Sequence, residues 1–283
     1  MATDAPIRLV VTGDDFGISR GANEAILRAH KEGILTSASL MINGNAARDA
    51  IRIAKENPSL GVGLHITLVQ GRSSLKPSET LGLVDQRFQF DDNPVRAGLR
   101  YFFNRSLRQY LRQEINAQVA EFRVTGIPMD HINGHLHFHL HPTIFGLLKR
   151  HANDWGIRAM RVTEDPLMLN LRIAGGRYFY RCSRALIFGR LAGRTRTSLA
   201  RRRIVQSDRV FGLLQDGRIT EKYLLRLLSE LWPGTYELYA HPDNDDHAHE
   251  TEALCSPRVR ELIEQRKIQL VRYADLYPGK ARE

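Results

Sequence analysis

The sequence predicts an α/β protein in which parallel strands alternate with helices. Short apolar runs rich in β-branched residues recur along the chain, and segments with apolar residues at i, i+3 and i+4 spacing separate them. Such alternation implies a parallel sheet with helical crossovers. No fixed-period repeat or low-complexity linker divides the 283 residues, so we expect a single domain over residues 1–283. An open doubly wound sheet and a closed barrel both fit this pattern.

The expected strands are the short apolar runs, and they lie at Ile7–Thr12, Ile34–Ile42, Gly61–Val69, Met129–Asn133, Ile157–Val162, Thr235–Ala240 and Ile268–Tyr273. The expected helices have one apolar face, and they lie at Ser19–Lys31, Asn45–Asn57, Ser106–Thr125, Pro142–Trp155, Thr220–Leu231 and Ser256–Arg266. Ser19 and Ser256 suit N-cap positions, and Pro142 and Pro257 suit the first turn of a helix. Residues 70–105 are expected to be irregular.

The composition is that of an ordinary globular protein with a basic balance. The 41 Lys and Arg residues against 31 Asp and Glu residues give a net charge of +10. The two cysteines form no CxxC pair, so we expect no disulfide and a reducing compartment. The segment MATDAPIRLVV lacks the features of a signal peptide, and no run of 18 apolar residues occurs. We therefore expect a cytoplasmic protein without a transmembrane helix.

A basic segment at residues 181–209 stands apart from the rest of the chain. Arg181–Arg203 holds eight arginines and no acidic residue, interleaved with Leu186, Ile187, Phe188 and Leu191. This pattern is typical of a basic amphipathic helix that contacts an anionic membrane surface. The alternative is a solvated surface helix or a mobile insertion.

Polar side chains gather at the ends of the expected strands. They are Asp14 and Asp15, Asn43, His65, Asn133 and His135, Arg161, and His241. Active sites in parallel α/β folds are built at the carboxyl ends of the strands. For each residue alone a simpler interpretation exists, because an Asp pair can form a turn or a helix cap and a lone histidine can be a bonded core residue. Their coincidence at strand ends favours an active site.

A histidine-rich segment points to a metal. Asp130–His141 holds five of the eleven histidines, and an extended chain would place alternate ones on one face. The alternative is a polar loop. Two imidazoles and one carboxylate make a three-ligand site with an open position, as in catalytic metal centres. A metal lowers the pKa of a bound water, and a nearby carboxylate can take its proton.

These residues lie in motifs that resemble the YdjC-like carbohydrate deacetylase family, which includes chito-oligosaccharide deacetylases. The motifs are TGDDFGIS, LTSASLMINGNAA, GVGLHITL, HINGHLHFH and ELYAHP, in the family's order over residues 7–273. NGHLHFHLHP and SDRVFGLL most resemble the branch associated with hopanoid biosynthesis. The resemblance implies a TIM-like (β/α) barrel with about seven parallel strands, and metal-dependent N-deacetylation.

The resemblance also assigns roles to individual residues. Asp15, His65 and His135 match the family's metal ligands, Asp14 its proposed base, and His241 its proposed acid. Two imidazoles favour Zn²⁺ on ligand softness, whereas the family is described with Mg²⁺. One departure is Asn133-Gly134-His135-Leu136, where common members read Asp-Ser-His-His. A carboxylate is thereby replaced by an amide.

The expected reaction is removal of the acetyl group from an N-acetylated amino sugar, with Arg161 or a backbone N–H helping to stabilise the oxyanion. The resemblance to the hopanoid branch implies a lipid-linked N-acetylglucosamine, reached by a protein peripheral to the inner face of the membrane. The alternatives are a soluble chito-oligosaccharide deacetylase and a metal-dependent phosphoesterase, although two-metal phosphoesterases need more carboxylates than these strand ends offer. A nucleic-acid binder is disfavoured, because no stacking aromatic motif accompanies the arginines. We also consider a homodimer.

Overall fold

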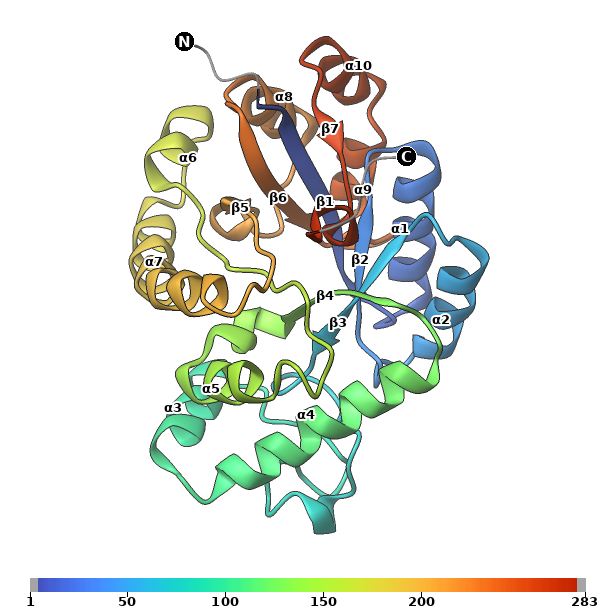
Figure 1. Ribbon diagram of the computed structural model, residues 1–283. Coiled ribbons are helices and arrows are strands. Elements are labelled where there is room, and N and C mark those ends of the chain that lie inside the picture. The colour runs from blue at the N-terminus through green and yellow to red at the C-terminus, as the bar shows by residue number, and fades with distance from the viewer. Residues whose placement is uncertain (1–4, 279–283) are drawn as a thin grey trace.

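Seven parallel strands form one sheet that curls into a half-barrel (Figure 1). The computed structural model describes residues 5–278. The strands are β1 (Ile7–Phe16), β2 (Ser37–Leu40), β3 (Gly61–Ile66), β4 (Met129–Gly134), β5 (Arg209–Phe211), β6 (Gly234–Ala240) and β7 (Gln269–Leu270). Their order is β4-β3-β2-β1-β6-β5, and β7 pairs with the start of β1. All strand pairs are parallel, as the alternating sequence pattern predicts.

The sheet does not close fully, which corrects the expected complete barrel. The run Ile157–Val162 does not form the expected strand, and its pairing is limited to single bridges from Met160 to Ile132 and from Ala159 to Val205. Beyond it, the backbone N–H of Val210 in β5 donates to the carbonyl of Glu164 at 3.1 Å. Irregular chain therefore crosses the gap between β4 and β5.

Helices cover the outside of the sheet (Figure 1). They are α1 (Arg20–Glu32), α2 (Ala47–Glu56), α3 (Pro94–Phe103), α4 (Leu107–Val124), α5 (Pro142–His151), α6 (Leu167–Ile173), α7 (Tyr178–Ala200), α8 (Glu221–Ser229), α9 (Ala248–Cys255) and α10 (Pro257–Gln265). The expected caps are confirmed, because Ser19 and Ser256 accept hydrogen bonds from the first turns of α1 and α10. In the described chain, no helix is long and apolar enough to cross a membrane.

The sequence pattern did not predict some of the helices. The 70–105 stretch is not irregular throughout, since it contains the short 3₁₀ helix η1 (Pro77–Glu79) and α3. Two more 3₁₀ helices follow strands, namely η2 (His135–Leu140) after β4 and η3 (Leu213–Gln215) after β5. The last expected strand shrinks to Gln269–Leu270 and leads into the 3₁₀ helix η4 (Tyr273–Leu276). The basic segment is largely the helix α7.

The strand β3 is buried along its whole length, and its two glycines create space for polar residues of β4. A Cβ on Gly61 would lie 2.8 Å from Cγ of Asp130, and one on Gly63 would lie 2.6 Å from the ring of His131. Real Cβ atoms do not approach neighbours so closely, so these positions require glycine. The GVG sequence therefore permits a polar pair inside an otherwise apolar sheet.

We predict opposite effects for two Gly→Ala changes. Gly63→Ala should lower the free energy of unfolding by about 1–3 kcal/mol, because the added methyl overpacks the core against His131. Gly146→Ala, in α5 with no atom within 4 Å of the new Cβ, should raise it by about 0.4–1 kcal/mol. Urea unfolding of both variants and the wild type measures this, and equal effects of the two changes would contradict it.

Candidate metal and active site

A bulge at the end of β1 turns two adjacent carboxylates toward the same cavity. Neighbouring residues of a regular strand point to opposite faces. Here the register with β2 shifts between Gly13 and Phe16, and Asp15 takes a left-handed φ of 60°. Asp14 and Asp15 consequently both line one cavity.

Asp15, His65 and His135 converge on a common point. They come from β1, from β3 and from the first residue after β4. Nε2 of His65 lies 3.2 Å and Nδ1 of His135 lies 2.9 Å from Oδ1 of Asp15. The three ligand atoms all lie within 4.8 Å of one another. Because ligands about 2.1 Å from one ion lie at most about 4.2 Å apart, small side-chain movements would allow a single divalent ion to bind.

The side-chain amide of Asn133 connects the imidazole of His65 with the carboxylate of Asp14. Its Oδ1 accepts a hydrogen bond from Nδ1 of His65 at 2.7 Å. Its Nδ2 donates to Oδ1 of Asp14 at 3.2 Å. The Nδ1 proton of His65 is thus used, and Nε2 is the nitrogen that faces Asp15, as a metal ligand at this point requires. This donor set fits a divalent cation.

Asp14 is held as an ionised carboxylate by Arg161. Burial alone would raise the pKa of Asp14, but the charge and the hydrogen bonds of Arg161 lower it far below its ordinary value. Arg161 is fully buried, donates to both oxygens of Asp14 with Nη1 and Nη2, and donates to Glu237 with Nε and Nη2. It lies behind Asp14 and is not among the residues that line the cavity. These contacts do not support the expected direct role of Arg161 at a reacting oxygen.

His241 lies across the same cavity, which has a volume of about 370 Å³. It follows β6 directly, and its Nδ1 is 3.6 Å from Oδ1 of Asp216. Burial works to lower the pKa of His241, but the carboxylates of Asp15, Asp216 and Asp14 outweigh it and raise the pKa. The cavity therefore contains a protonatable imidazole opposite the three-ligand set.

The remaining histidines of Asp130–His141 do not share one face, which corrects the extended arrangement considered for this segment. After Gly134 the chain coils into η2, where Leu136 and His137 have left-handed φ values of 49° and 60°. His137 lines the cavity and contacts the hydroxyl of Tyr239 at 2.9 Å. His139 is buried against the carbonyl of Arg161 at 3.1 Å. Burial lowers the pKa of both histidines, so they are neutral.

Sequence reasoning missed Asp216 and Arg184, which also line the cavity. Asp216 follows η3, and the side chain of Arg184 projects from α7 with its guanidinium 5.2 Å from the centre of the Tyr180 ring. Neither belongs to a strand end recognisable in the sequence. The short η3 and the long α7 bring them to the site.

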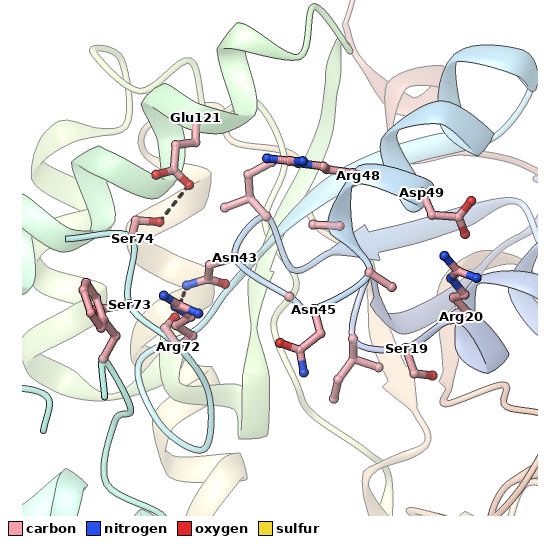
Figure 2. Close-up of a pocket in the computed structure, with 16 residues that line it drawn as sticks. Ser19, Arg20, Asn43, Asn45, Arg48, Asp49, Arg72, Ser73, Ser74 and Glu121 are labelled. Carbon is pink, nitrogen blue, oxygen red and sulfur yellow. Dashed lines mark hydrogen bonds between the residues drawn. The ribbon is translucent and has the colours of Figure 1, made fainter. Parts of the chain in front are cut away.

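A second hollow of about 890 Å³ lies among the loops that follow β1, β2 and β3 (Figure 2). It is lined by Asn43, three arginines (Arg20, Arg48, Arg72) and Ser73. The amide of Asn43 donates to the backbone carbonyl of Arg72, and the Arg72 guanidinium lies 4.9 Å from the centre of the Phe88 ring. Asn43, which was expected at the site, therefore lies in this neighbouring hollow.

The chain is similar to known proteins over most of its length. The profile of the family described as YdjC-like protein matches residues 8–265. A carbohydrate deacetylase of Brevibacillus brevis is 34% identical over 151 residues, and a chitooligosaccharide deacetylase of Proteus mirabilis is 34% identical over 167 residues. These matches cover 53% and 56% of this chain, and 58% and 60% of the relatives' own lengths.

A crystal structure of a putative cellobiose-phosphate cleavage protein from Enterococcus faecalis has the same fold. Its TM-score is 0.74 at 22% sequence identity, and the match covers 96% of this chain and 100% of that one. At this level of identity the comparison establishes the fold alone.

We predict that the three converging residues bind one divalent ion together. Changing Asp15, His65 or His135 to Ala should remove most bound Zn²⁺, measured by metal analysis and calorimetric titration. The melting temperature of each metal-free variant should stay near that of the metal-free wild type, because the sheet core packs without an ion. Unchanged Zn²⁺ affinity in all three variants would contradict the prediction.

Proposed function

Because this chain belongs to the YdjC-like protein family, we propose that it is a divalent-metal-dependent hydrolase that removes the acetyl group from an N-acetylated amino sugar. The observation that carries the proposal is the convergence of Asp15, His65 and His135 in one cavity with Asp14 and His241. Three ligands with an open position are typical of catalytic metal centres. The relatives' names, carbohydrate and chitooligosaccharide deacetylase, agree with the proposed substrate class.

Asp15, His65 and His135 would hold the ion, either Zn²⁺ or Mg²⁺. A divalent ion there supplies polarisation of the acetyl carbonyl and activation of a water molecule. Asp14 accepts the proton of the attacking water as the new C–O bond forms. His241 donates a proton to the amide nitrogen as the C–N bond breaks, so the products are acetate and the free amine.

The surroundings of Asp14 and His241 suit these opposite roles. Arg161 keeps Asp14 ionised and fixes the direction of its carboxylate, so we assign Arg161 a positioning role. The carboxylate of Asp216 favours the protonated form of His241. Two groups whose pKa values are pushed apart make an acid–base pair.

A phosphoesterase is less well supported by the groups present. Among residues 5–278, Asp15, His65 and His135 are the one set of three potential ligands close enough to hold an ion. Two-metal phosphoesterases need a second set nearby. The basic net charge therefore needs a different explanation.

Within this function, we propose that the substrate is a lipid-linked N-acetylglucosamine, as in the hopanoid-associated branch. The support is a group of exposed large apolar side chains, which we call the apolar face. Its members are the exposed large side chains of three helices, namely Val95, Leu99, Phe102 and Phe103 of α3, Met168 of α6, and Tyr178, Phe179, Leu186 and Ile187 of α7. The helices α3 and α7 both contact α5 and lie on one side of the molecule (Figure 1).

The helix α7 connects this face with the cavity. Arg184 lines the cavity, and the ring of Phe188 lies 5.4 Å from that of His137. Phe179, which is 89% exposed, belongs to the same helix. A lipid surface in contact with α7 would therefore lie against a helix that also contributes Arg184 to the cavity.

The arginines of α7 are less uniformly available than the sequence suggests. Arg181 is buried, and Arg196 pairs with Glu164 at 2.6 Å. Arg190, Arg194 and the run Arg201–Arg203 remain exposed. Five exposed cations and an apolar patch suit an anionic membrane, and like charge disfavours a second copy of this chain. We propose a cytoplasmic protein peripheral to the inner face of the membrane.

A soluble chito-oligosaccharide is the second candidate substrate, and the 890 Å³ hollow favours it. Its amide, hydroxyl and guanidinium groups and the ring of Phe88 are the kinds of group that bind sugars. Comparing acetate release from chito-oligosaccharides and from a lipid-linked N-acetylglucosamine separates the two candidates. Faster turnover of the soluble sugar would overturn the lipid-linked substrate, but the proposed deacetylase activity would stand.

We predict that activity requires the ion and both titratable groups. The wild type should release acetate from an N-acetylated amino sugar and lose this activity in a chelator. Asp14→Asn should keep Zn²⁺ and lose turnover by about 100-fold or more, because an amide cannot accept the proton. His241→Ala should lose turnover, and less so with a better leaving group. Phosphate release in place of acetate release, or near-normal turnover by Asp14→Asn, would refute the assignment.

We predict that the wild type sediments with anionic lipid vesicles and that salt weakens this binding. Each arginine near an anionic surface contributes about 1 kcal/mol, so changing Arg202 and Arg203 to Glu should weaken binding at least about tenfold. Phe102→Ser with Phe103→Ser should weaken it as well. The matched control changes Arg258 and Arg260 of α10 to Glu.

Three outcomes would overturn the membrane assignment. The wild type could fail to bind anionic vesicles at low salt, or the control could weaken binding equally. Alternatively, ultracentrifugation could show a dimer that Phe103→Ser dissociates. The last outcome would assign the apolar face to a homodimer.

A further inference from the structure

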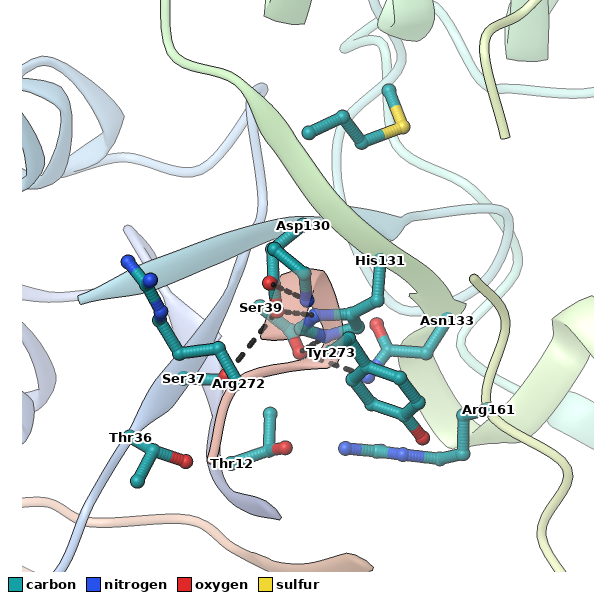
Figure 3. A network of polar contacts seen from close by, with 12 residues as sticks. Thr12, Thr36, Ser37, Ser39, Asp130, His131, Asn133, Arg161, Arg272 and Tyr273 are labelled. Atoms are coloured by element: carbon teal, nitrogen blue, oxygen red, sulfur yellow. Dashed lines mark hydrogen bonds and ion pairs between the residues drawn. The ribbon is translucent and has the colours of Figure 1, made fainter. Parts of the chain in front are cut away.

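A chain of buried polar side chains runs from η4 to the metal-ligand set. Figure 3 shows its members Asp130, His131, Ser39 and Asn133. The proposed reaction uses only its last member, His65, as a metal ligand. Its members, in order, are the backbone N–H of Ala274 and the side chains of Asp130, His131, Ser39, Asn133 and His65. All five side chains are at most 3% exposed. Each link is a hydrogen bond, so a donor and an acceptor can be assigned at one link after another.

The chain begins at a carboxylate. The backbone N–H of Ala274 donates to Oδ1 of Asp130 at 2.7 Å, and the hydroxyl of Ser37 donates to Oδ2 at 3.2 Å. Burial alone would raise the pKa of Asp130, but the hydrogen bonds from His131, from the backbone of Ala274 and from Ser37 outweigh it and lower the pKa. Asp130 is therefore ionised, and an ionised carboxylate only accepts hydrogen bonds.

This carboxylate fixes the proton on His131. Nδ1 of His131 lies 2.9 Å from Oδ2 of Asp130, so Nδ1 carries the hydrogen. The hydroxyl of Ser39 lies 3.0 Å from Nε2 of His131, and it donates to this nitrogen when Nδ1 alone carries the ring proton. A serine hydroxyl has a single hydrogen, so the Ser39 oxygen can only accept from Asn133.

The direction of the chain then fixes the orientation of Asn133. Its Nδ2 donates to the Ser39 oxygen at 2.8 Å, which leaves Oδ1 to face Nδ1 of His65. Asp14, ionised by Arg161, independently requires the same orientation, because its Oδ1 accepts from Nδ2 of Asn133. The amide is thus held from two sides, by Ser39 and by Asp14.

We propose that Asp130, His131 and Ser39 are positioning residues that set which nitrogen of His65 is available to a metal. With the chain intact, His65 carries its proton on Nδ1 and presents Nε2 toward Asp15. A reversed Asn133 amide would place its NH₂ group against Nδ1 of His65. Nε2 would then carry the proton and could not bind the ion.

The residues that surround this hydrogen-bonded chain leave room for it. The ring of Tyr273 packs on that of His131 at 5.0 Å, and Gly61 and Gly63 make room for Asp130 and His131. If these hydrogen bonds served only to satisfy buried polar groups, donors and acceptors could be arranged in either direction along the chain. Here every hydrogen bond from Asp130 to His65 has a fixed donor and acceptor, so the chain also determines which nitrogen of His65 carries the proton.

The test is a double-mutant cycle between the two groups that hold Asn133. Ser39→Ala and Asp14→Ala should each raise the Zn²⁺ dissociation constant less than tenfold, since the other group still orients the amide. The double variant should raise it at least about 100-fold, well beyond the product of the single effects. Nitrogen-15 NMR of the metal-free proteins should show His65 protonated on Nδ1 in the wild type, and a mixture of tautomers in the double variant.

Matched variants separate positioning from simple loss of stability. Ser39→Thr and Ser39→Val introduce side chains of the same shape, and only Ser39→Thr keeps a hydroxyl, so only this variant should retain the wild-type tautomer when combined with Asp14→Ala. Ser37→Ala removes a buried hydroxyl of the same strand outside the segment between His131 and Asn133, so it should leave the tautomer unchanged. Melting temperatures monitor folding.

Multiplicative effects in the cycle, with Nδ1 of His65 still protonated in the double variant, would overturn the proposal. These readouts need neither substrate nor turnover. The positioning role and the proposed deacetylase activity can therefore fail separately.

Discussion

The side-chain amide of Asn133 is the contact on which the arrangement of this site depends. It bonds to His65, a potential metal ligand, and to Asp14, the proposed base, and its two ends cannot be exchanged without placing like groups together. An aspartate at this position would set a second carboxylate against Asp14. The amide therefore suits a site in which Asp14 already carries the negative charge that Arg161 pairs.

Buried charge is the second constraint on the site. Arg161 lies between Asp14 and Glu237 with no exposed surface, and Glu237 also accepts hydrogen bonds from Thr12 and Tyr273. Removing such charges from water costs free energy that their attraction only partly returns, so this network contributes more to orientation than to stability. A carboxylate fixed in direction and kept ionised is what a proton acceptor beside a metal requires.

The sequence predicted correctly that these polar side chains lie together, because the parallel fold brings the ends of its strands to one edge. Asp14, Asp15, His65, His135 and His241 line one cavity, although they lie far apart in the chain. Predictions failed where side-chain direction depends on local backbone geometry. The left-handed turn at Leu136 and His137 disperses the histidines, and contacts across the barrel bury His131. The spacing of residues in the sequence reveals neither the turn nor the burial of His131. The sequence pattern also missed α3 and β5, which are short or exposed.

In the proposed site, Asp15, His65 and His135 hold one divalent ion next to a carboxylate, Asp14, that does not bind it. Crystallography of the protein with Zn²⁺, using anomalous scattering at the zinc edge, tests this most directly. We expect one strong peak about 2.0–2.2 Å from Nε2 of His65, a nitrogen of His135 and an oxygen of Asp15, with Asp14 still paired to Arg161. A peak bound by Asp14, or zinc bound elsewhere with these three side chains free, would contradict it.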